Sequence, residues 1–365
     1  MRSFPIARRS LAIVAATLSF ACSRGVAVST SEPTPLPSTP PAAAGAGVMD
    51  ADVRRLLGAL AHDSMQGRGT ATPGSARAAR FIAEEFARYG VQPAGDSGFF
   101  QRVPVALRTR NGRRVPGLLP SLEARDTVQA DARADAVNVV GVIPGSDPAL
   151  RDQVVLIDAH YDHLGIRSGE GPDSIYNGAD DDASGVVAVM EIARALARGP
   201  APKRTVVFAA TTGEEVGLLG TRWYIQHPAR PLEAMVANLE IEMIGRPDAM
   251  AGGAGRGWLT GFERSTMGEL FAQAGLPIVA DARPNEQFFM RSDNIAFAQL
   301  GIVAHTLSSF NMHNDYHQVT DDVSHVDFAH MTRLVDVAVR AARLLADTPT
   351  KLEWKPGGRP AAPSR

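Results

Sequence analysis

The chain has 365 residues with 37 Lys or Arg and 39 Asp or Glu, so its formal charge is 37 − 39 = −2 when the histidines are neutral. This balance, without any Lys/Arg-rich block, argues against nucleic acid as a partner, because affinity for phosphates depends on basic surfaces. With 45% apolar and 21% charged residues, the composition is that of a globular protein and excludes disorder of the whole chain.

The N-terminal residues resemble an export signal. Arg2, Arg8 and Arg9 precede an apolar or small run from Leu11 to Ala21. This run is too short for a transmembrane helix, which needs about 20 residues, whereas a charged start followed by a short apolar run is typical of a signal peptide. We therefore predict a signal peptide over residues 1–21 and an exported protein, in the periplasm or outside the cell.

Two alternatives remain for the end of this signal. The segment Leu18-Ser19-Phe20-Ala21-Cys22 resembles a bacterial lipoprotein signal, in which Cys22 would carry a lipid anchor that tethers the protein to a membrane. Simple cleavage after Ala21 is the other alternative. The residues that follow, 22–49, are rich in Ser, Thr, Pro, Ala and Gly and lack hydrophobic periodicity, so we predict a flexible tether.

Helical and strand patterns alternate along residues 50–348. In chain order they predict helices at Ala51–His62 and Ser75–Tyr89, strands at Val137–Ile143 and Gln153–Asp158, a helix at Ser184–Arg198, a strand at Arg204–Ala210, a helix at Gly217–His227, a strand at Met235–Ile241, a helix at Gly261–Ala274, a strand at Gly301–Thr306 and a helix at Asp327–Ala346. This alternation predicts a single α/β domain with a mixed, mostly parallel sheet covered by helices on both faces. Residues 349–365 are expected to form a disordered tail.

Acidic residues and histidines follow several of the predicted strands, where ligands of open α/β sheets bind. His160 comes directly after one strand, and Asp162 is placed to fix the tautomer of its imidazole. Glu214 and Glu215 follow the next strand. Because adjacent carboxylates point in different directions, one can bind a metal while the other moves a proton.

Further acidic residues lie at two other segments. Asp180, Asp181 and Asp182 open a predicted helix, where one Asp would serve as an N-cap but three repel one another unless a cation binds. Glu240 and Glu242 fall on one face of a predicted strand end, because side chains alternate along a strand.

These residues predict the kind of metal that is bound. Cys22 is the only cysteine, so a thiolate site is excluded and the ligands must be His, Asp and Glu. Imidazole ligands indicate zinc or cobalt, and the number of carboxylates indicates two ions. Two ions about 3.5–4 Å apart can hold a carbonyl oxygen and lower the pKa of a shared water. The sequence therefore predicts a hydrolase.

Taken together, the motifs resemble peptidase family M28, the dinuclear zinc aminopeptidases that also include glutamate carboxypeptidase, the transferrin receptor ectodomain and glutaminyl cyclase. The resemblance runs from about Val53 to Leu345. It rests on Gln66-Gly67-Arg68-Gly69, His160-x-Asp162, Gly178–Gly185, Glu214–Gly220, Glu242–Gly245, Arg291-Ser292-Asp293 and Tyr316-His317. The segment between Phe100 and Val137 is too short for the protease-associated domain that some relatives insert, so we expect a compact catalytic domain.

The resemblance assigns a role to each candidate residue. It implies two zinc ions, the first bound by His160 and Glu242, the second by Glu215 and His317, and both bridged by Asp181. It further implies that Asp162 supports His160, that Glu214 is the general base and that the hydroxyl of Tyr316 stabilises the tetrahedral oxyanion. Many relatives have Asp at the position of Glu242.

The implied activity is that of an exported aminopeptidase that hydrolyses peptide substrates, with Glu214 moving the proton of the attacking water. A carboxypeptidase or dipeptidase with the same centre is an alternative, for which Arg246, Arg283 and Arg291 could bind the substrate carboxylate. A catalytically silent member or one with glutaminyl cyclase chemistry is a further alternative.

Overall fold

The computed structural model describes residues 47–110, 112–167 and 173–362, all within one compact unit, Ala42–Arg365. The predicted signal peptide and almost all of the predicted tether lie outside the described residues. Among the helices described, none combines the length and the apolar character that crossing a membrane requires.

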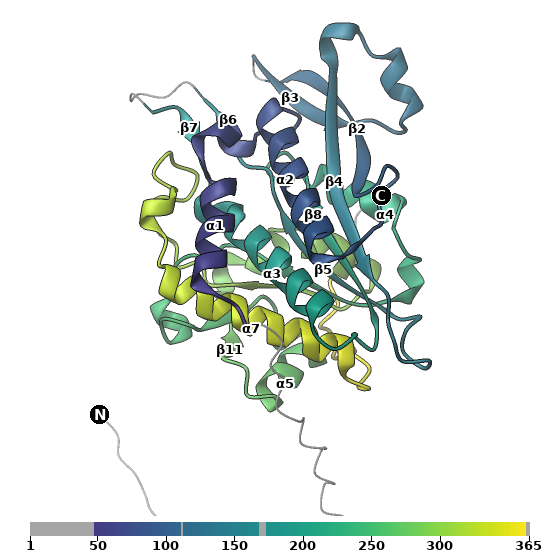
Figure 1. The fold of residues 1–365 in the computed structure, drawn as a ribbon, viewed down its shortest axis with the longest axis vertical. Coiled ribbons are helices and arrows are strands. Elements are labelled where there is room, and N and C mark those ends of the chain that lie inside the picture. Colours follow the sequence, from purple (N-terminus) through teal and green to yellow (C-terminus); the bar gives the residue numbers. More distant parts are fainter. Residues whose placement is uncertain (1–46, 111, 168–172, 363–365) are drawn as a thin grey trace, which may run out of the picture. The chain divides into compact units, whose positions relative to one another are not determined.

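The centre of the sheet is parallel (Figure 1). It consists of four neighbouring strands in the order β12 (Ala304–Ser308), β9 (Met235–Ile241), β5 (Val154–His160) and β8 (Thr205–Thr211). All three pairings between these neighbours are parallel. The carboxyl ends of the four strands therefore meet at one edge of the sheet.

Antiparallel strands extend this centre on both sides. Beyond β8 lie β4 (Arg133–Ile143), β2 (Phe100–Arg110) and β3 (Arg113–Leu118), each antiparallel to its neighbour. Beyond β12 lies β10 (Gly257–Leu259), which is antiparallel to β12 and parallel to β11 (Ile278–Ala280). Short strands complete the described part: β1 (Gln92–Pro93) pairs with β4, and β6 (Gly165–Ile166) pairs with β7 (Ile175–Tyr176).

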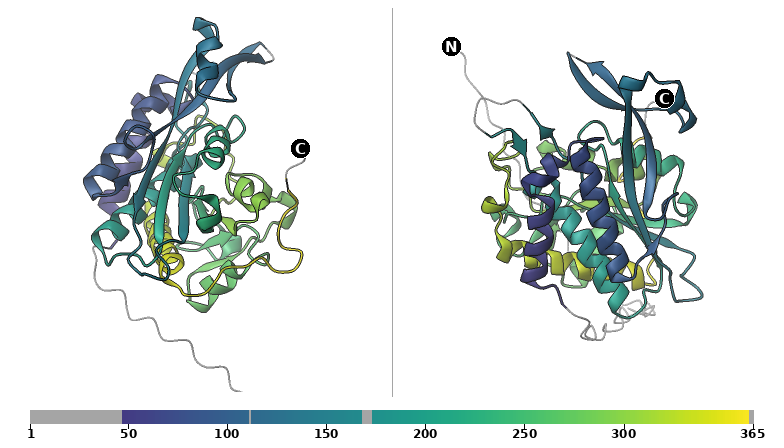
Figure 2. Two further views of the ribbon diagram at one scale, coloured as in Figure 1. Left: turned by 90° about the vertical axis from the view of Figure 1, so that its right-hand side faces the viewer. Right: turned by 45° about the horizontal axis from the view of Figure 1, so that its top comes forward.

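Helices cover both faces of the sheet. One face packs against α1 (Asp50–Leu60), α2 (Pro73–Tyr89), α3 (Gly185–Arg198) and α7 (Phe328–Asp347), which lie in front of the sheet in Figure 1. The other face packs against α4 (Leu219–Gln226) and α6 (Asn294–Leu300). The helix α5 (Thr266–Gln273) contacts β11. Figure 2 shows α1 and α2 on one side of the sheet when the molecule is turned by 90°.

Side-chain alternation explains the two layers. Along β5, Val155 and Ile157 belong to the core under α3 and α7, whereas Val154 and Leu156 belong to the core under α4 and α6. All seven residues of β5 are buried. A strand buried on both faces needs the continuous apolar run that the sequence contains, and the prediction of a mixed sheet flanked by helices is confirmed.

The structure contains elements that the sequence patterns did not predict, among them β2, β3, β10, β11 and α6. The strands β2 and β3 pair as a long antiparallel hairpin, which lies with β4 at the top of Figure 1. The described part of the expected disordered tail, residues 349–362, lies against the domain: the indole Nε1 of Trp354 donates to the Gly301 carbonyl at 2.9 Å, and Trp354 forms a β-bridge with Ser265.

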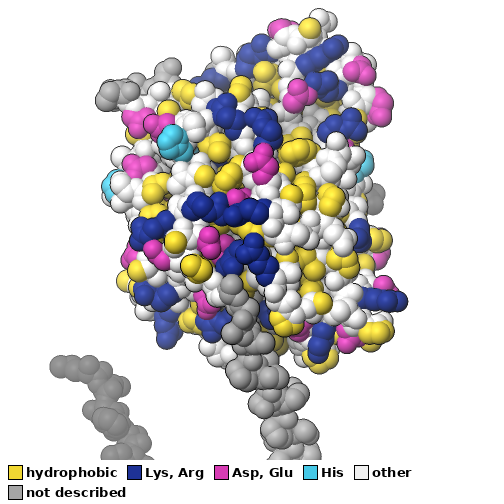
Figure 3. All heavy atoms as spheres, in the orientation of Figure 1, with side chains coloured by type: hydrophobic (Ala, Val, Ile, Leu, Met, Phe, Trp, Pro, Cys, Tyr) yellow, Lys and Arg dark blue, Asp and Glu magenta, His cyan; other side chains and the backbone are white. Residues whose placement is uncertain are grey.

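The surface over the α1, α2, α3 layer carries both signs of charge. Figure 3 shows Lys and Arg interspersed with Asp and Glu and with apolar side chains on this face. The face therefore presents mixed charge, as the formal net charge of −2 leads one to expect.

Candidate metal centre

The predicted site residues come together at the carboxyl edge of the parallel strands. His160 is the last residue of β5, and Glu242 follows directly on β9. Glu215 lies four residues beyond β8, and His317 lies in the loop that follows β12. The strands carrying these segments are immediate neighbours, which explains how residues far apart in the sequence converge.

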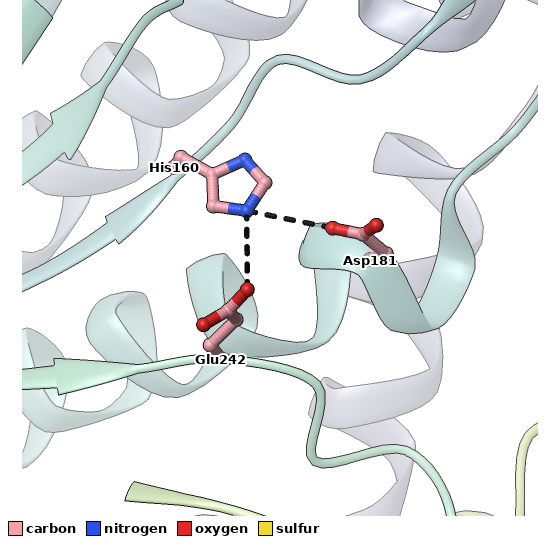
Figure 4. A group of neighbouring side chains, drawn as sticks. All are labelled: His160, Asp181 and Glu242. Atoms are coloured by element: carbon pink, nitrogen blue, oxygen red, sulfur yellow. Dashed lines mark ion pairs between the residues drawn. The ribbon is translucent and has the colours of Figure 1, made fainter. Parts of the chain in front are cut away.

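The first cluster consists of His160, Asp181 and Glu242 (Figure 4). The Nε2 atom of His160 is 3.4 Å from Asp181 Oδ1 and 3.9 Å from Glu242 Oε1. One donor atom from each side chain lies within 4.8 Å of the others. This spacing could hold one metal ion.

The second cluster shares Asp181 and adds Glu215, His317 and His163. Asp181 Oδ2 is 3.1 Å from His317 Nε2 and 3.7 Å from His163 Nδ1. Glu215 Oε1 is 3.3 Å from His317 Nε2 and 2.8 Å from His163 Nδ1. The two oxygens of Asp181 thus face different clusters, the arrangement expected of a carboxylate between two cations. His163 was not among the residues singled out from the sequence.

The two neighbours of Asp181 have different partners. Asp182 Oδ1 accepts hydrogen bonds from the backbone N–H of Met243 and of Gly185, each at 3.0 Å. Asp180 Oδ1 accepts from the N–H of Gly245 at 2.6 Å. These two aspartates therefore hold the segment that follows β9 against the start of α3, while Asp181 points into the clusters.

A buried arginine fixes the backbone around both clusters. The guanidinium of Arg68, fully buried, donates to the carbonyls of Tyr161 at 2.7 Å, Asn177 at 2.5 Å and Gly178 at 2.7 Å. It thereby ties the segment after β5 to the turn that carries Asp181. The sequence signal for this residue was the Gln66-Gly67-Arg68-Gly69 segment, to which no role had been given.

Asp162 supports the site differently from what the sequence suggested. Its backbone carbonyl, not its carboxylate, lies at hydrogen-bond distance from His160 Nδ1, at 3.1 Å, while the closest carboxylate oxygen is 3.9 Å away. An N–H on Nδ1 leaves Nε2 free to bind a metal. The carboxylate instead accepts from the Thr70 hydroxyl at 2.7 Å and from the backbone N–H of Glu214 at 3.2 Å.

Glu214 belongs to neither cluster but lies beside them in the same pocket as Asp181 and Glu242. Burial raises its pKa well above the ordinary value, and His160 only partly opposes this rise. Burial and the charge of Glu240 likewise raise the pKa of Glu242 to about 8. A carboxylate with a raised pKa is better able to accept a proton and return it near neutral pH.

Tyr316 lies over His317, with ring centroids 3.9 Å apart. It lines the same pocket as Glu214. Burial raises the pKa of its hydroxyl, so that the group stays protonated at neutral pH and can donate a hydrogen bond.

The polar atoms without hydrogen-bond partners indicate that the clusters fit a metal. Among the described residues, His160 Nε2, His163 Nδ1 and Glu215 Oε1 are buried atoms without such a partner. A buried polar atom left unpaired costs about 1–3 kcal/mol, and native proteins rarely leave one without a reason. All three atoms face the clusters. Nitrogen and oxygen donors without sulfur suit zinc.

One wall of the pocket beside the first cluster is aromatic. Trp258, Phe288 and Phe310 line it together with Met243. Trp258 and Phe288 stack with ring centroids 5.1 Å apart, and Phe288 meets Phe310 edge-on at 5.8 Å. These rings pack against one another and give the pocket an apolar wall.

Of the three arginines considered for a substrate carboxylate, one lines this pocket. Arg291 does so, with 41% of its side chain exposed. Arg283 donates to both carboxylate oxygens of Asp248, at 2.6 and 2.8 Å, and Arg246 donates to Asp315 at 2.5 Å. These two ion pairs serve to hold loops together.

The family model for peptidase family M28 matches residues 138–342. Among curated relatives, the chain is 27% identical over 237 residues to a vacuolar membrane protease of Tuber melanosporum, covering 61% of this chain and 22% of that protein. It is 31% identical over 175 residues to a probable zinc metalloprotease of Pyricularia oryzae, covering 48% of this chain and 30% of that protein. The chain thus spans less than a third of the length of these relatives.

Solved structures of two bacterial aminopeptidases share the fold. A zinc aminopeptidase from Bacillus subtilis has a TM-score of 0.59 at 14% identity, covering 82% of this chain and 96% of the other. An aminopeptidase from Aneurinibacillus sp. strain AM-1 has a TM-score of 0.57 at 17% identity, covering 85% and 96%. At this level of identity, the likeness concerns the fold.

Proposed function

The chain belongs to peptidase family M28, a family of zinc-dependent peptidases, and we propose that it is an aminopeptidase with two zinc ions. The observation that carries the proposal is the position of Asp181, whose Oδ1 faces His160 at 3.4 Å and whose Oδ2 faces His317 at 3.1 Å. Asp181 would bridge the ions. His160 and Glu242 would complete the first site, and Glu215 and His317 the second.

When bound, the zinc ions would polarise the scissile carbonyl and lower the pKa of the attacking water. Glu214 accepts the proton of this water and delivers it to the leaving amine. Its backbone N–H donates to the carboxylate of Asp162, which fixes the start of the segment that carries it. The Tyr316 hydroxyl donates a hydrogen bond to the oxygen anion of the tetrahedral intermediate.

The charges around the pocket support an aminopeptidase. Asp181, Glu214 and Glu242 line it, whereas Arg291 is the cation at the same pocket. With Asp181 and Glu242 bound to zinc, Glu214 would be the lining carboxylate left to face a substrate ammonium group. The aromatic pocket supports peptides that begin with an apolar side chain.

Arg291 also favours a second candidate function, a carboxypeptidase or dipeptidase with the same centre. Its guanidinium lies over the Phe288 ring at 5.0 Å, in a position to meet a substrate carboxylate. The pairing of Arg246 and Arg283 with aspartates weakens this alternative, because a single half-exposed arginine would have to bind the carboxylate.

We also propose that the protein is exported and that Cys22 is the point of cleavage or lipid attachment. The support is the order of Arg2, Arg8 and Arg9 before the apolar run that ends at Ala21. A lipid anchor would tether the catalytic domain to a membrane through residues 22–49. Mass spectrometry of the mature N-terminus separates acylated Cys22 from simple cleavage.

A substrate panel tests the aminopeptidase proposal. The purified protein is loaded with zinc and given leucyl, phenylalanyl and glutamyl p-nitroanilides, their N-acetylated forms, and peptides with a free or an amidated C-terminus. We expect turnover of the unblocked leucyl and phenylalanyl substrates and none of the N-acetylated ones. Cleavage that requires a free C-terminus would support the carboxypeptidase instead, and no hydrolysis with two zinc ions bound would refute both.

A further inference from the structure

His163 is a buried histidine beside the second cluster. We propose that His163 is a direct ligand of the second zinc ion, so that three buried side chains, His163, Asp181 and Glu215, hold this ion in addition to His317. The proposal rests on the dinuclear function given above and adds a third imidazole to it.

The position of the His163 ring is fixed by its surroundings. The side chain has no exposed surface, and the residue forms a parallel bridge with Gly69. Gly178 packs on the ring so closely that a Cβ at that position would lie 2.5 Å from His163 Cγ. The Nδ1 atom is therefore held toward Asp181 and Glu215.

The distances between the donor atoms fit one tetrahedral ion. Zinc with bonds of about 2.0–2.1 Å to nitrogen and oxygen places its ligand atoms about 3.3 Å apart. The four measured separations lie around this value: His163 Nδ1 is 2.8 Å from Glu215 Oε1 and 3.7 Å from Asp181 Oδ2, and His317 Nε2 is 3.3 Å and 3.1 Å from the same two atoms. The His163 and His317 rings meet at 65° with centroids 5.7 Å apart, so both can approach the ion without overlap.

A hydrogen bond from His163 to Glu215 explains the geometry less well. Nδ1 lies 2.8 Å from Glu215 Oε1, yet both are buried atoms without a hydrogen-bond partner. Leaving these buried atoms unpaired would be costly. An ion between Nδ1 and Oε1 pairs both atoms at once.

With His163 as a ligand, the two zinc sites would differ in their number of imidazole ligands. The first would have one imidazole, His160, and the second would have two. His317 is 35% exposed on the loop after β12, whereas His163, Asp181 and Glu215 are buried. The buried trio would therefore contribute most of the shielded ligands of the second ion, and His317 the exposed one.

The substitution His163→Asn separates a ligand from a positioning residue. The Asn side chain can place an amide N–H near the position of Nδ1, from which it can donate to Glu215, but it lacks the imidazole nitrogen that zinc prefers. The matched control is His305→Asn, because His305 is also buried but has its own partners, the Thr260 carbonyl and the Ser265 hydroxyl, both at 2.7 Å.

Two measurements on the full chain give the answer. The first is stepwise zinc affinity, measured by competition with a chromophoric chelator. We expect His163→Asn to weaken the second ion by more than about 100-fold, beyond the loss typical of a residue that only supports a ligand, with His305→Asn close to wild type. The second is the proton NMR spectrum of the cobalt-loaded protein, in which each ligating imidazole gives a paramagnetically shifted, exchangeable N–H signal.

The wild-type spectrum should contain three such signals, one of which is lost in His163→Asn. Two signals in the wild type, or retention of every signal and of the second ion's affinity in His163→Asn, would overturn the role of His163 while leaving the dinuclear centre intact. Fewer than two ions in the wild-type protein would instead refute the dinuclear centre, and the assignment of His163 with it. If His163→Asn fails to fold, the wild-type spectrum still decides between three imidazoles and two.

Discussion

Gly178 determines where Asp181 and His163 lie relative to one another. Its φ is 57°, in the left-handed region, and a Cβ there would lie 2.2 Å from the Asp181 carbonyl oxygen and 2.5 Å from His163 Cγ. Arg68 holds the Gly178 carbonyl from the other side at 2.7 Å. A residue without any side chain is thus needed at the point where the two clusters share a carboxylate.

We predict that Gly178→Ala destabilises the protein and weakens zinc binding. The left-handed backbone alone costs an alanine about 1–2 kcal/mol, and the two close contacts add to this. Urea unfolding and zinc titration measure both effects. Gly58→Ala is the control, because a Cβ at Gly58, inside α1, has open space and alanine is favoured there; equal behaviour of the two variants would contradict the prediction.

The site residues differ in how well their roles could be predicted from the sequence. The convergence of His160, Asp181, Glu215 and His317 was predicted, because each follows a strand or opens a helix at one edge of an α/β sheet. His163 was missed because a histidine next to a candidate ligand carries no signal of its own; only the packing of Gly178 shows which way its ring points. For Asp162, the carboxylate was predicted to contact His160, whereas the backbone carbonyl does so. The sequence does not distinguish a contact through the carbonyl from one through the carboxylate.

At the scale of elements, the central parallel strands could be predicted from the sequence. The flanking strands β2, β3, β10 and β11 could not. The runs that form β5 and β8 are largely apolar because both faces are buried, whereas β9 also contains the buried polar residues Asn238 and Glu240. The hairpin of β2 and β3 is partly exposed, contains Pro104 and Pro116, and is rich in arginine, so the sequence pattern predicted no strand there. Its pairing with β4 depends on contacts that only the folded chain provides.

The C-terminal segment is a second element whose role came from the structure. Trp354 contacts the rings of Phe289 and His305, with centroids 6.2 and 5.3 Å away, and donates its indole N–H to Gly301. The sequence after residue 348 has no periodicity, so the segment was expected to be disordered. Backbone hydrogen bonds also attach the segment, from the Thr266 N–H to the Glu353 carbonyl at 3.0 Å and from the Lys355 N–H to the Arg264 carbonyl at 2.9 Å.

We predict that Trp354→Ala destabilises the domain by about 2–4 kcal/mol, because it removes partly buried aromatic packing and a hydrogen bond. Chemical denaturation of the zinc-loaded protein measures the change in the free energy of unfolding. The control is Lys351→Ala, whose side chain is 82% exposed. A loss below about 0.5 kcal/mol for Trp354→Ala would show that the segment does not contribute to stability.

At the scale of the whole molecule, a formal charge of −2 conceals a concentration of negative charge inside the domain. Asp181, Glu214, Glu215 and Glu242 converge at one edge of the sheet, where burial favours their neutral forms. Histidines hold the pKa of Asp181 well below its ordinary value and that of Glu215 at about 2, so that part of this charge persists. Two zinc ions would neutralise it.

We therefore predict that removal of zinc lowers the melting temperature reversibly. A ligand present at 100 times its dissociation constant stabilises the folded state by about 2.7 kcal/mol for each site. Differential scanning calorimetry of the protein before chelation, after chelation and after return of zinc measures the effect, with magnesium as the control ion. An unchanged melting temperature after complete removal of zinc would contradict the role of the clusters in neutralising buried charge.

Glu214 is assigned the transfer of the proton, while other residues are assigned to hold the metal. The substitution Glu214→Gln tests this division of roles most directly. The amide keeps the shape of the side chain but cannot accept a proton, so kcat on an unblocked substrate should fall by about 10²–10⁴-fold. Two zinc ions per chain should remain, because Glu214 is in neither cluster, and the exposed control Glu233→Gln should behave as wild type. Activity of Glu214→Gln within a few-fold of wild type, with both ions bound, would contradict the account.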